Sequence, residues 1–172
     1  MKLRSLLLTL LATICALPLA AQLESGKVYR FINKADSNIA MSAATTTTVY
    51  GAAVANGNYA QLWLAEQHPY NSNAWSLRSL GNGLYLKPMG TSTKWTFTTA
   101  PNSSTVLYCV STGSDYYTMN NSTTLGAMCM HYATSQGGAI VGWNTDADAT
   151  HWQIQEVSVR SEEHTSELQS PS

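Results

Sequence analysis

The chain has 172 residues, of which 44% are hydrophobic and 11% are charged, and its formal net charge is −1. Nine Lys and Arg residues against ten Asp and Glu residues leave no concentrated basic surface. This balance argues against nucleic acid and against polybasic membrane contact as partners. The size and composition are those of a globular protein with one hydrophobic core.

The first residues have the pattern of a secretory signal peptide. Two basic residues, Lys2 and Arg4, precede an apolar run over residues 6–19, and small residues follow it. The run is shorter than the roughly 18–20 residues that a bilayer-spanning helix needs. We therefore expect a signal peptide over residues 1–21 and a secreted or cell-surface location for the mature chain.

The last residues, 160–172, are unlike everything before them. They resemble the translation of a sequencing adapter, so they are excluded from fold prediction. This predicts that the natural reading frame is interrupted near Val159 and continues into a downstream domain, which is one expected partner. The remaining residues, 22–159, are expected to form a single domain.

Between these ends, short runs rich in Thr, Tyr, Val and Trp alternate with turns rich in Gly, Asn, Ser and Asp. No stretch has the spacing of an amphipathic helix, so the pattern predicts an all-β domain. The predicted strands, in chain order, are residues 27–32, 39–42, 61–66, 75–80, 85–87, 94–98, 105–111, 117–120, 127–132, 139–143 and 151–157. About a dozen short strands in one domain indicate a closed or sandwiched architecture.

Two cysteines remain in the predicted domain, Cys109 and Cys129, and each lies in an apolar run. An exported chain meets an oxidising environment, in which the pair can form a disulfide. Two small buried apolar residues are the alternative. The sequence leaves both open, because geometry decides whether a bridge can form.

The predicted strands fall into three units of roughly forty residues each, a length typical of structural repeats. The units cover residues 26–67, 74–111 and 116–157. Each opens with an aromatic or apolar strand, continues through a polar turn and then enters a second short apolar strand. The first and third units also end alike, because residues 61–63 (Gln-Leu-Trp) are echoed by residues 150–152 (Thr-His-Trp).

A threefold array of such units that ends in a Gln-x-Trp motif resembles the ricin-type β-trefoil lectin domain, as found in secreted bacterial glycan-processing proteins. The resemblance spans nearly the whole domain. The motif is intact only at residues 61–63, since Thr150 replaces the glutamine before Trp152 and the second unit has neither residue. The resemblance implies an all-β fold, a β-trefoil with three four-stranded repeats. A β-sandwich carbohydrate-binding module is the alternative.

Sugar recognition requires a flat ring that stacks on a pyranose and fixed polar groups that bond its hydroxyls. The resemblance places an acid in the first turn of a unit, an aromatic on the third strand and an amide near the closing motif. In the first unit these are Asp36, Tyr50 and Asn58, with Gln61 as the residue that braces the pocket. In the third unit they are Asn120 or Asn121, Trp143 as the platform, and Asp146 or Asp148 as hydroxyl acceptors.

Several of these residues have a structural alternative. Trp63 and Trp152 are expected in the core, each closing a unit, rather than in contact with a ligand. Asp36 has the alternative of an Asx-turn, in which its side chain bonds its own backbone. Trp143 stands at the boundary between a strand and a loop, and either burial or exposure fits that position.

Metal and catalytic motifs are missing from the predicted domain. Asn144, Asp146 and Asp148 alternate as at the start of a calcium loop, but the Gly and Glu that an EF-hand needs further on are absent. The sequence shows no zinc-ligand spacing, no evident pair of catalytic carboxylates and no Gly-x-Ser-x-Gly motif. We predict no metal, no cofactor and no enzymatic activity.

These features lead to a glycan-binding, lectin-like module of an exported protein, which targets an attached domain to polysaccharide or glycoconjugate. The alternative is a structural or protein-binding β domain, such as an adhesin or a spacer, which the divergent second unit favours. An exposed aromatic residue beside polar amides distinguishes the lectin from the spacer.

Overall fold

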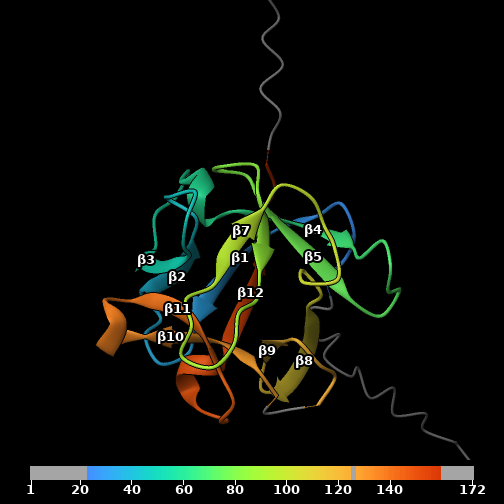
Figure 1. Ribbon diagram of the computed structural model, residues 1–172. Coiled ribbons are helices and arrows are strands. Elements are labelled where there is room, and N and C mark those ends of the chain that lie inside the picture. The colour runs from blue at the N-terminus through green and yellow to red at the C-terminus, as the bar shows by residue number, and fades with distance from the viewer. Residues whose placement is uncertain (1–22, 125–126, 160–172) are drawn as a thin grey trace, which may run out of the picture.

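The computed structural model describes residues 23–124 and 127–159, which form twelve β-strands and three 3-10 helices (Figure 1). The predicted signal peptide, residues 1–21, and the adapter-like residues 160–172 lie outside this part. No helix of the described residues has the length and apolar character needed to cross a bilayer. The strands are β1 (Val28–Asn33), β2 (Ile39–Ser42), β3 (Tyr50–Ala53), β4 (Trp63–Gln67), β5 (Trp75–Ser79), β6 (Tyr85–Lys87), β7 (Thr96–Thr98), β8 (Tyr108–Gly113), β9 (Tyr116–Asn120), β10 (Cys129–Ala133), β11 (Ala139–Trp143) and β12 (Trp152–Glu156). The helices are η1 (Tyr59–Gln61), η2 (Thr134–Gln136) and η3 (Asp148–Thr150).

Six strands, β1, β4, β5, β8, β9 and β12, close into an antiparallel barrel (Figure 1). The strand β1 pairs with β12 and β4, β4 pairs with β5, and β9 pairs with β8 and β12. The last seam lies between Trp75 and Leu107, whose backbones exchange hydrogen bonds of 2.7 and 3.0 Å. Closure satisfies the backbone groups that an open sheet edge would expose.

The other six strands form three hairpins, β2–β3, β6–β7 and β10–β11, one from each sequence unit. Equivalent residues of the three units are joined in a ring of backbone hydrogen bonds. Val49 N donates to Trp95 O at 3.1 Å, Trp95 N donates to Ile140 O at 2.8 Å, and Ile140 N donates to Val49 O at 2.9 Å. Such a cyclic pattern relates the hairpins by a pseudo-threefold axis.

The core repeats the same symmetry. Equivalent positions supply three completely buried layers: Phe31, Leu77 and Met119; Met41, Leu86 and Met130; and Trp63, Leu107 and Trp152. The two indoles have matching partners, since Trp63 Nε1 donates to Met41 O at 3.2 Å and Trp152 Nε1 donates to Met130 O at 2.8 Å. Both tryptophans are thus core residues, as their structural alternative predicts.

Gln61 of the Gln-x-Trp motif lies at the end of η1 and is completely buried. Its Nε2 donates to Ala53 O at 2.6 Å, and its Oε1 accepts from Ala55 N at 2.9 Å. The amide therefore fastens the segment after β3 to the start of β4.

Threonine takes the place of this glutamine in the other two units. The Thr150 hydroxyl donates to Ala147 O at 2.7 Å and accepts from Ala147 N at 3.2 Å. The Thr105 hydroxyl bonds Asn102 O and N in the same way, at 2.8 and 3.0 Å. Both threonines are completely buried. Where the motif glutamine is absent, a shorter threonine side chain therefore bonds a backbone segment that is closer in the sequence.

Each of the eleven predicted strands overlaps an observed one, and residues 39–42, 85–87 and 139–143 have the predicted bounds. The prediction missed β3, whose Gly-Ala-Ala run at residues 51–53 has weak β propensity. It also began the fourth strand too early, because residue 61 belongs to η1.

The two cysteines of the described part are not joined by a disulfide. Cys109 on β8 lies opposite Met119, and Cys129 on β10 lies opposite Asn120, so β9 separates them. Two strand spacings amount to about 9–10 Å, which is beyond the reach of a disulfide. Burial raises the pKa of the Cys109 thiol to about 12.

Candidate functional site

The third unit brings its candidate residues together across three neighbouring strands. Trp143, the last residue of β11, lies opposite Cys129 on β10. Cys129 in turn lies opposite Asn120 at the end of β9. The end of β9 and the end of β11 therefore lie on either side of the start of β10.

Trp143 differs from the other tryptophans in its exposure. Of the five tryptophans in the chain, Trp143 alone is not buried. The His131 ring stacks on it with a centroid distance of 5.3 Å and an interplanar angle of 26°. Partial burial lowers the pKa of His131, which favours the neutral imidazole. The indole is thus held by a neighbouring ring and keeps part of its surface open to solvent.

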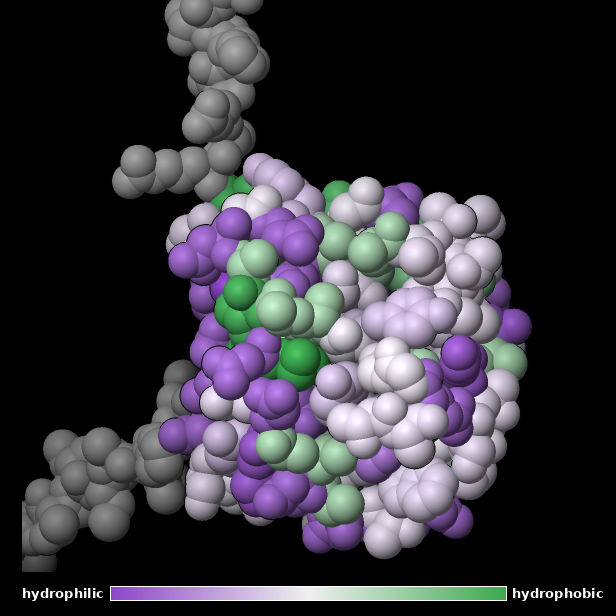
Figure 2. Space-filling model, turned by 90° about the vertical axis from the view of Figure 1, so that its left-hand side faces the viewer, coloured by the Kyte–Doolittle hydropathy of each residue, from purple (hydrophilic) through white to green (hydrophobic). Residues whose placement is uncertain are grey.

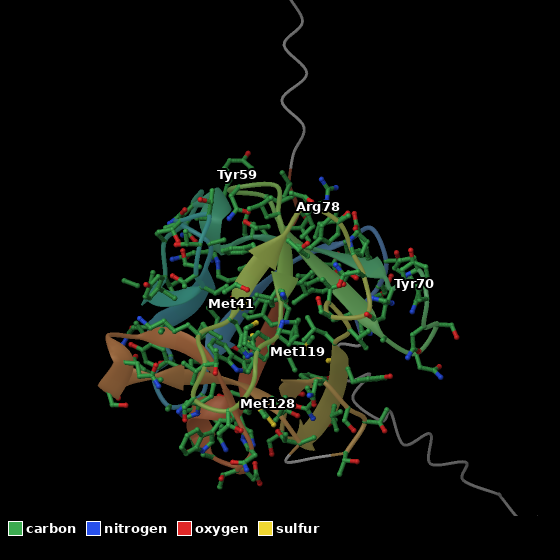
Figure 3. The ribbon with its side chains drawn as sticks, in the orientation of Figure 1. Met41, Tyr59, Tyr70, Arg78, Met119 and Met128 are labelled. Carbon is green, nitrogen blue, oxygen red and sulfur yellow. The ribbon has the colours of Figure 1, made fainter. Side chains whose placement is uncertain are left out.

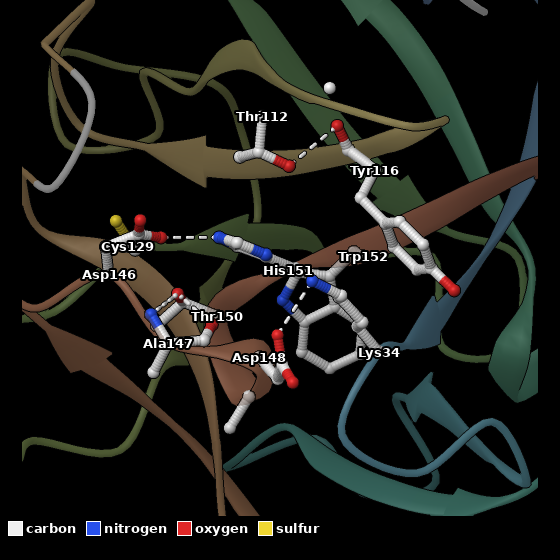
Figure 4. Close-up of polar contacts among 12 residues, drawn as sticks. Lys34, Thr112, Tyr116, Cys129, Asp146, Ala147, Asp148, Thr150, His151 and Trp152 are labelled. Atoms are coloured by element: carbon white, nitrogen blue, oxygen red, sulfur yellow. Dashed lines mark hydrogen bonds and ion pairs between the residues drawn. The ribbon is translucent and has the colours of Figure 1, made fainter.

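Two carboxylates follow Trp143, and each contacts a basic side chain (Figure 4). Asp146 accepts from His151 Nε2 at 2.5 Å, and Asp148 at the start of η3 pairs with Lys34 Nζ at 2.8 Å. The Lys34 ammonium holds the pKa of Asp148 below its usual value. Both carboxylates are exposed and retain acceptor positions for hydroxyl donors.

The two asparagines of the third unit are placed differently. Asn120 is completely buried and donates from Nδ2 to Thr124 O at 3.3 Å, so it is not available on the surface. Asn121 is exposed. Together with Ser103 and Ser104 of the second unit, it lines a hollow of about 300 Å³ whose lining contains no aromatic residue. Asn121 is therefore the surface amide of the pair.

In the first unit, Asp36 and Tyr50 do not meet. Asp36 Oδ1 accepts from Asn38 N at 2.9 Å, which is the Asx-turn alternative. The β2–β3 register places Ala53 beside this turn and Tyr50 at the other end of the hairpin. A distance of three residues along a strand is about 10 Å. The predicted pocket between the two residues is therefore not formed.

Tyr50 instead packs against the third unit. It lies opposite Ala139 and joins a small cluster that contains Ala133 and Val141. Lys94 Nζ lies 5.7 Å from the centre of its ring. The sequence prediction placed Tyr50 at the platform position. Strand β3 was not predicted, so the register of this segment was unknown.

The strand register identifies the platform position in all three units. Trp143 lies opposite Cys129, Ala52 lies opposite Ala40, and Thr98 lies opposite Tyr85, at equivalent points of the three hairpins. The three platform positions are therefore occupied by Ala52, Thr98 and Trp143. Of these, only Trp143 has an aromatic ring.

The last two candidates of the first unit have backbone partners. Asn58 caps η1, since its Oδ1 accepts from Ala60 N at 3.1 Å. Gln61 bonds the backbone of Ala53 and Ala55, and its complete burial keeps it from direct ligand contact.

His131 and Lys34 contact candidate residues of the third unit, Trp143 and Asp148, but the sequence pattern did not predict these contacts. The strand alternation was a usable signal for His131, because it lies two residues after Cys129 and so shares the face of Trp143. Lys34 had no such signal, because it comes from the first unit and meets Asp148 only in the folded chain.

The face that carries hairpins β2–β3 and β10–β11 is mostly hydrophilic, with small hydrophobic areas separated by polar ones (Figure 2). A broad apolar surface for protein docking is absent from this view. Within residues 23–124 and 127–159, no group of three His, Cys, Asp or Glu side chains is arranged to hold a metal ion.

No protein-family model and no curated protein sequence matches the chain. Among solved structures, the chain is similar to ThreeFoil, a designed protein with threefold symmetry, at a TM-score of 0.63 and 12% identity. The match covers 76% of this chain and 99% of that protein.

Two natural proteins are similar over one part of their own chains. A Polyporus squamosus lectin, solved with the epitope Neu5Acα2-6Galβ1-4GlcNAc, matches at a TM-score of 0.65 and 15% identity, over 78% of this chain and 50% of the lectin. An endo-β-galactosidase from Clostridium perfringens that releases GlcNAcα1-4Gal matches at 0.63 and 17%, over 77% of this chain and 33% of the enzyme. These likenesses agree with the closed barrel, the three hairpins and the pseudo-threefold core. The chain therefore has the β-trefoil fold of ricin-type lectins.

Proposed function

We propose that the chain binds glycans through its third unit and has no catalytic activity of its own. The observation that carries this proposal is Trp143, a half-buried indole at the mouth of its hairpin, when every other tryptophan is buried. Its ring supplies the stacking surface, and the exposed carboxylate of Asp146, three residues further on, supplies a hydrogen-bond acceptor in the same unit. Supporting evidence is the sugar bound to a protein of the same fold.

We further propose that the module is exported and targets an attached domain to glycans. The signal-like residues 1–21 support export. Attachment is supported by the two natural proteins above, in which the matching part is half or a third of a longer chain. A single site of this kind binds weakly. Its attachment to another domain raises the effective concentration of that domain at the glycan.

The test is binding of the chain to an array of neutral oligosaccharides, followed by isothermal titration calorimetry with the best binder. Trp143→Ala should weaken binding at least about tenfold, the loss expected when a stacking ring is removed. Tyr70→Ala is the matched control, because Tyr70 is 78% exposed and lies between β4 and β5, outside the third unit. Binding that survives Trp143→Ala, or no binding to any glycan, contradicts the proposal and favours the spacer.

A further inference from the structure

Arg30 on β1 is a buried cation with no anionic partner among the described residues. The residue is only 7% exposed, and no carboxylate of the described part lies within ion-pair distance of it. The nearest strand neighbour with a charge, Glu156 opposite Tyr29, is already paired with Lys27 at 3.1 Å. A buried guanidinium without a counter-charge is costly, so this arrangement calls for an explanation.

Hydrogen bonds to the loop before η1 use only some of the N–H donors of the Arg30 guanidinium. Arg30 Nη2 donates to Ala55 O at 3.1 Å, and Nη1 donates to Asn56 Oδ1 at 3.4 Å. Nε is buried and has no hydrogen-bond partner in the described part of the chain. Both acceptors are neutral, and a guanidinium carries five N–H donors, so the charge and most donors are left over.

The same side chain lines a hollow of about 190 Å³, whose other walls include Gly57, Tyr59 and Ser158. Tyr59 is 53% exposed, so its ring is open to solvent beside the cation. Pockets that enclose drug-sized ligands measure roughly 300–1,000 Å³, so this smaller one suits a single sugar ring.

We propose that this pocket binds an acidic monosaccharide unit, such as a hexuronate, with its carboxylate on Arg30 and its ring against Tyr59. The inference rests on the proposed glycan binding but concerns a separate surface. A guanidinium matches a carboxylate in geometry and charge, and an aromatic ring matches the C–H face of a pyranose. The pairing selects an acidic sugar over a neutral one, because only the acid supplies the missing negative charge.

The test is an NMR titration of the 15N-labelled chain with methyl β-D-glucuronide, and in parallel with methyl β-D-glucoside. The glucuronide should shift the backbone amides of Gly57 and Ser158 to saturation, and the glucoside at equal concentration should not. Added salt should weaken the glucuronide binding, because the attraction is between charges. Equal shifts from both glycosides, or unshifted Gly57 and Ser158 amides with the glucuronide, would overturn the inference.

Two variants assign the binding to the named side chains. Tyr59→Ala and Arg30→Lys should each raise the glucuronide Kd about tenfold or more, which is the effect expected for a lost charge-assisted or stacking contact. Tyr70→Ala is the matched control, since Figure 3 shows Tyr70 on a different side of the molecule from Tyr59. If Arg30→Lys does not fold, Tyr59→Ala decides, and an unchanged Kd there rejects the site.

The same titration separates this inference from the proposed function. Trp143 belongs to the third unit, so its indole N–H signal reports neutral glycans independently of Gly57. A neutral glycan that shifts Trp143, with no response of Gly57 to the glucuronide, rejects the acidic site alone. A glucuronide response at Gly57 with no glycan response at Trp143 rejects the third-unit site alone.

Discussion

The first and third units share one scaffold and differ in what they present to solvent. Both have a tryptophan that closes the unit and donates to the carbonyl of a buried methionine, Trp63 to Met41 and Trp152 to Met130. At the platform position, however, the first unit has Ala52 and the third has Trp143. The symmetric core therefore carries different residues at equivalent surface positions of the two units.

The intact motif and the candidate platform stand in different units. Gln61 belongs to the unit without a platform ring, and Thr150 belongs to the unit with one. Both side chains are completely buried and bond backbone groups. The motif residue thus bonds the backbone of its unit, and it is independent of whether the unit has an aromatic ring at the platform position.

The largest expected effect tests the shared part of the comparison. Trp63→Ala and Trp152→Ala should each lower the free energy of unfolding by about 3–5 kcal/mol, because each leaves a large cavity in the core. Urea denaturation measures both. A loss in one unit that is several-fold smaller than in the other would break the equivalence of the two tryptophans.

A smaller effect is expected where the two units are fastened differently. Gln61→Thr should lower the free energy of unfolding by about 1–3 kcal/mol, because Ala53 O and Ala55 N lose their partner. Thr150→Ser keeps its hydroxyl and is the matched variant, with an expected loss below about 1 kcal/mol. Equal losses in urea denaturation would show that the Gln61 amide does not fasten its segment.

Tyr50 sharpens the contrast with Trp143, because both are aromatic residues of a third strand. Tyr50→Ala should leave glycan binding unchanged and lower the free energy of unfolding by about 1 kcal/mol, since its ring packs on Ala133 and Val141. Calorimetry and urea denaturation measure the two quantities. Weaker glycan binding without a loss of stability would restore Tyr50 as a platform.

The smallest expected effect concerns pH. Burial lowers the pKa of His131, so below the ordinary histidine pKa of about 6.5 the unfolded chain takes up a proton that the folded chain resists. This contribution to stability is complete above about pH 6.5 and is lost as the pH falls toward the lowered pKa. His131→Gln should have a flatter dependence of Tm on pH between 7 and 5. Identical slopes for both proteins would contradict the assignment.

The sequence was sufficient to predict the all-β class, eleven of the strands and the threefold repeat, because turn residues and apolar runs are local signals. It did not locate β3, whose Gly51 and Ala52 carry little strand preference. Without that strand the register was unknown, and Tyr50 was predicted at the platform position, which Ala52 occupies in the structure. Contacts between units, such as Lys34 with Asp148, have no local signal at all.

The most direct test of the account is 19F NMR of the chain labelled with 5-fluorotryptophan. Five tryptophans give five signals, and Trp143→Phe identifies the signal of Trp143 by its loss. A bound glycan should shift the Trp143 signal and leave those of Trp63 and Trp152 in place. A glycan that binds without moving the Trp143 signal would contradict the claim that this indole is the sugar platform.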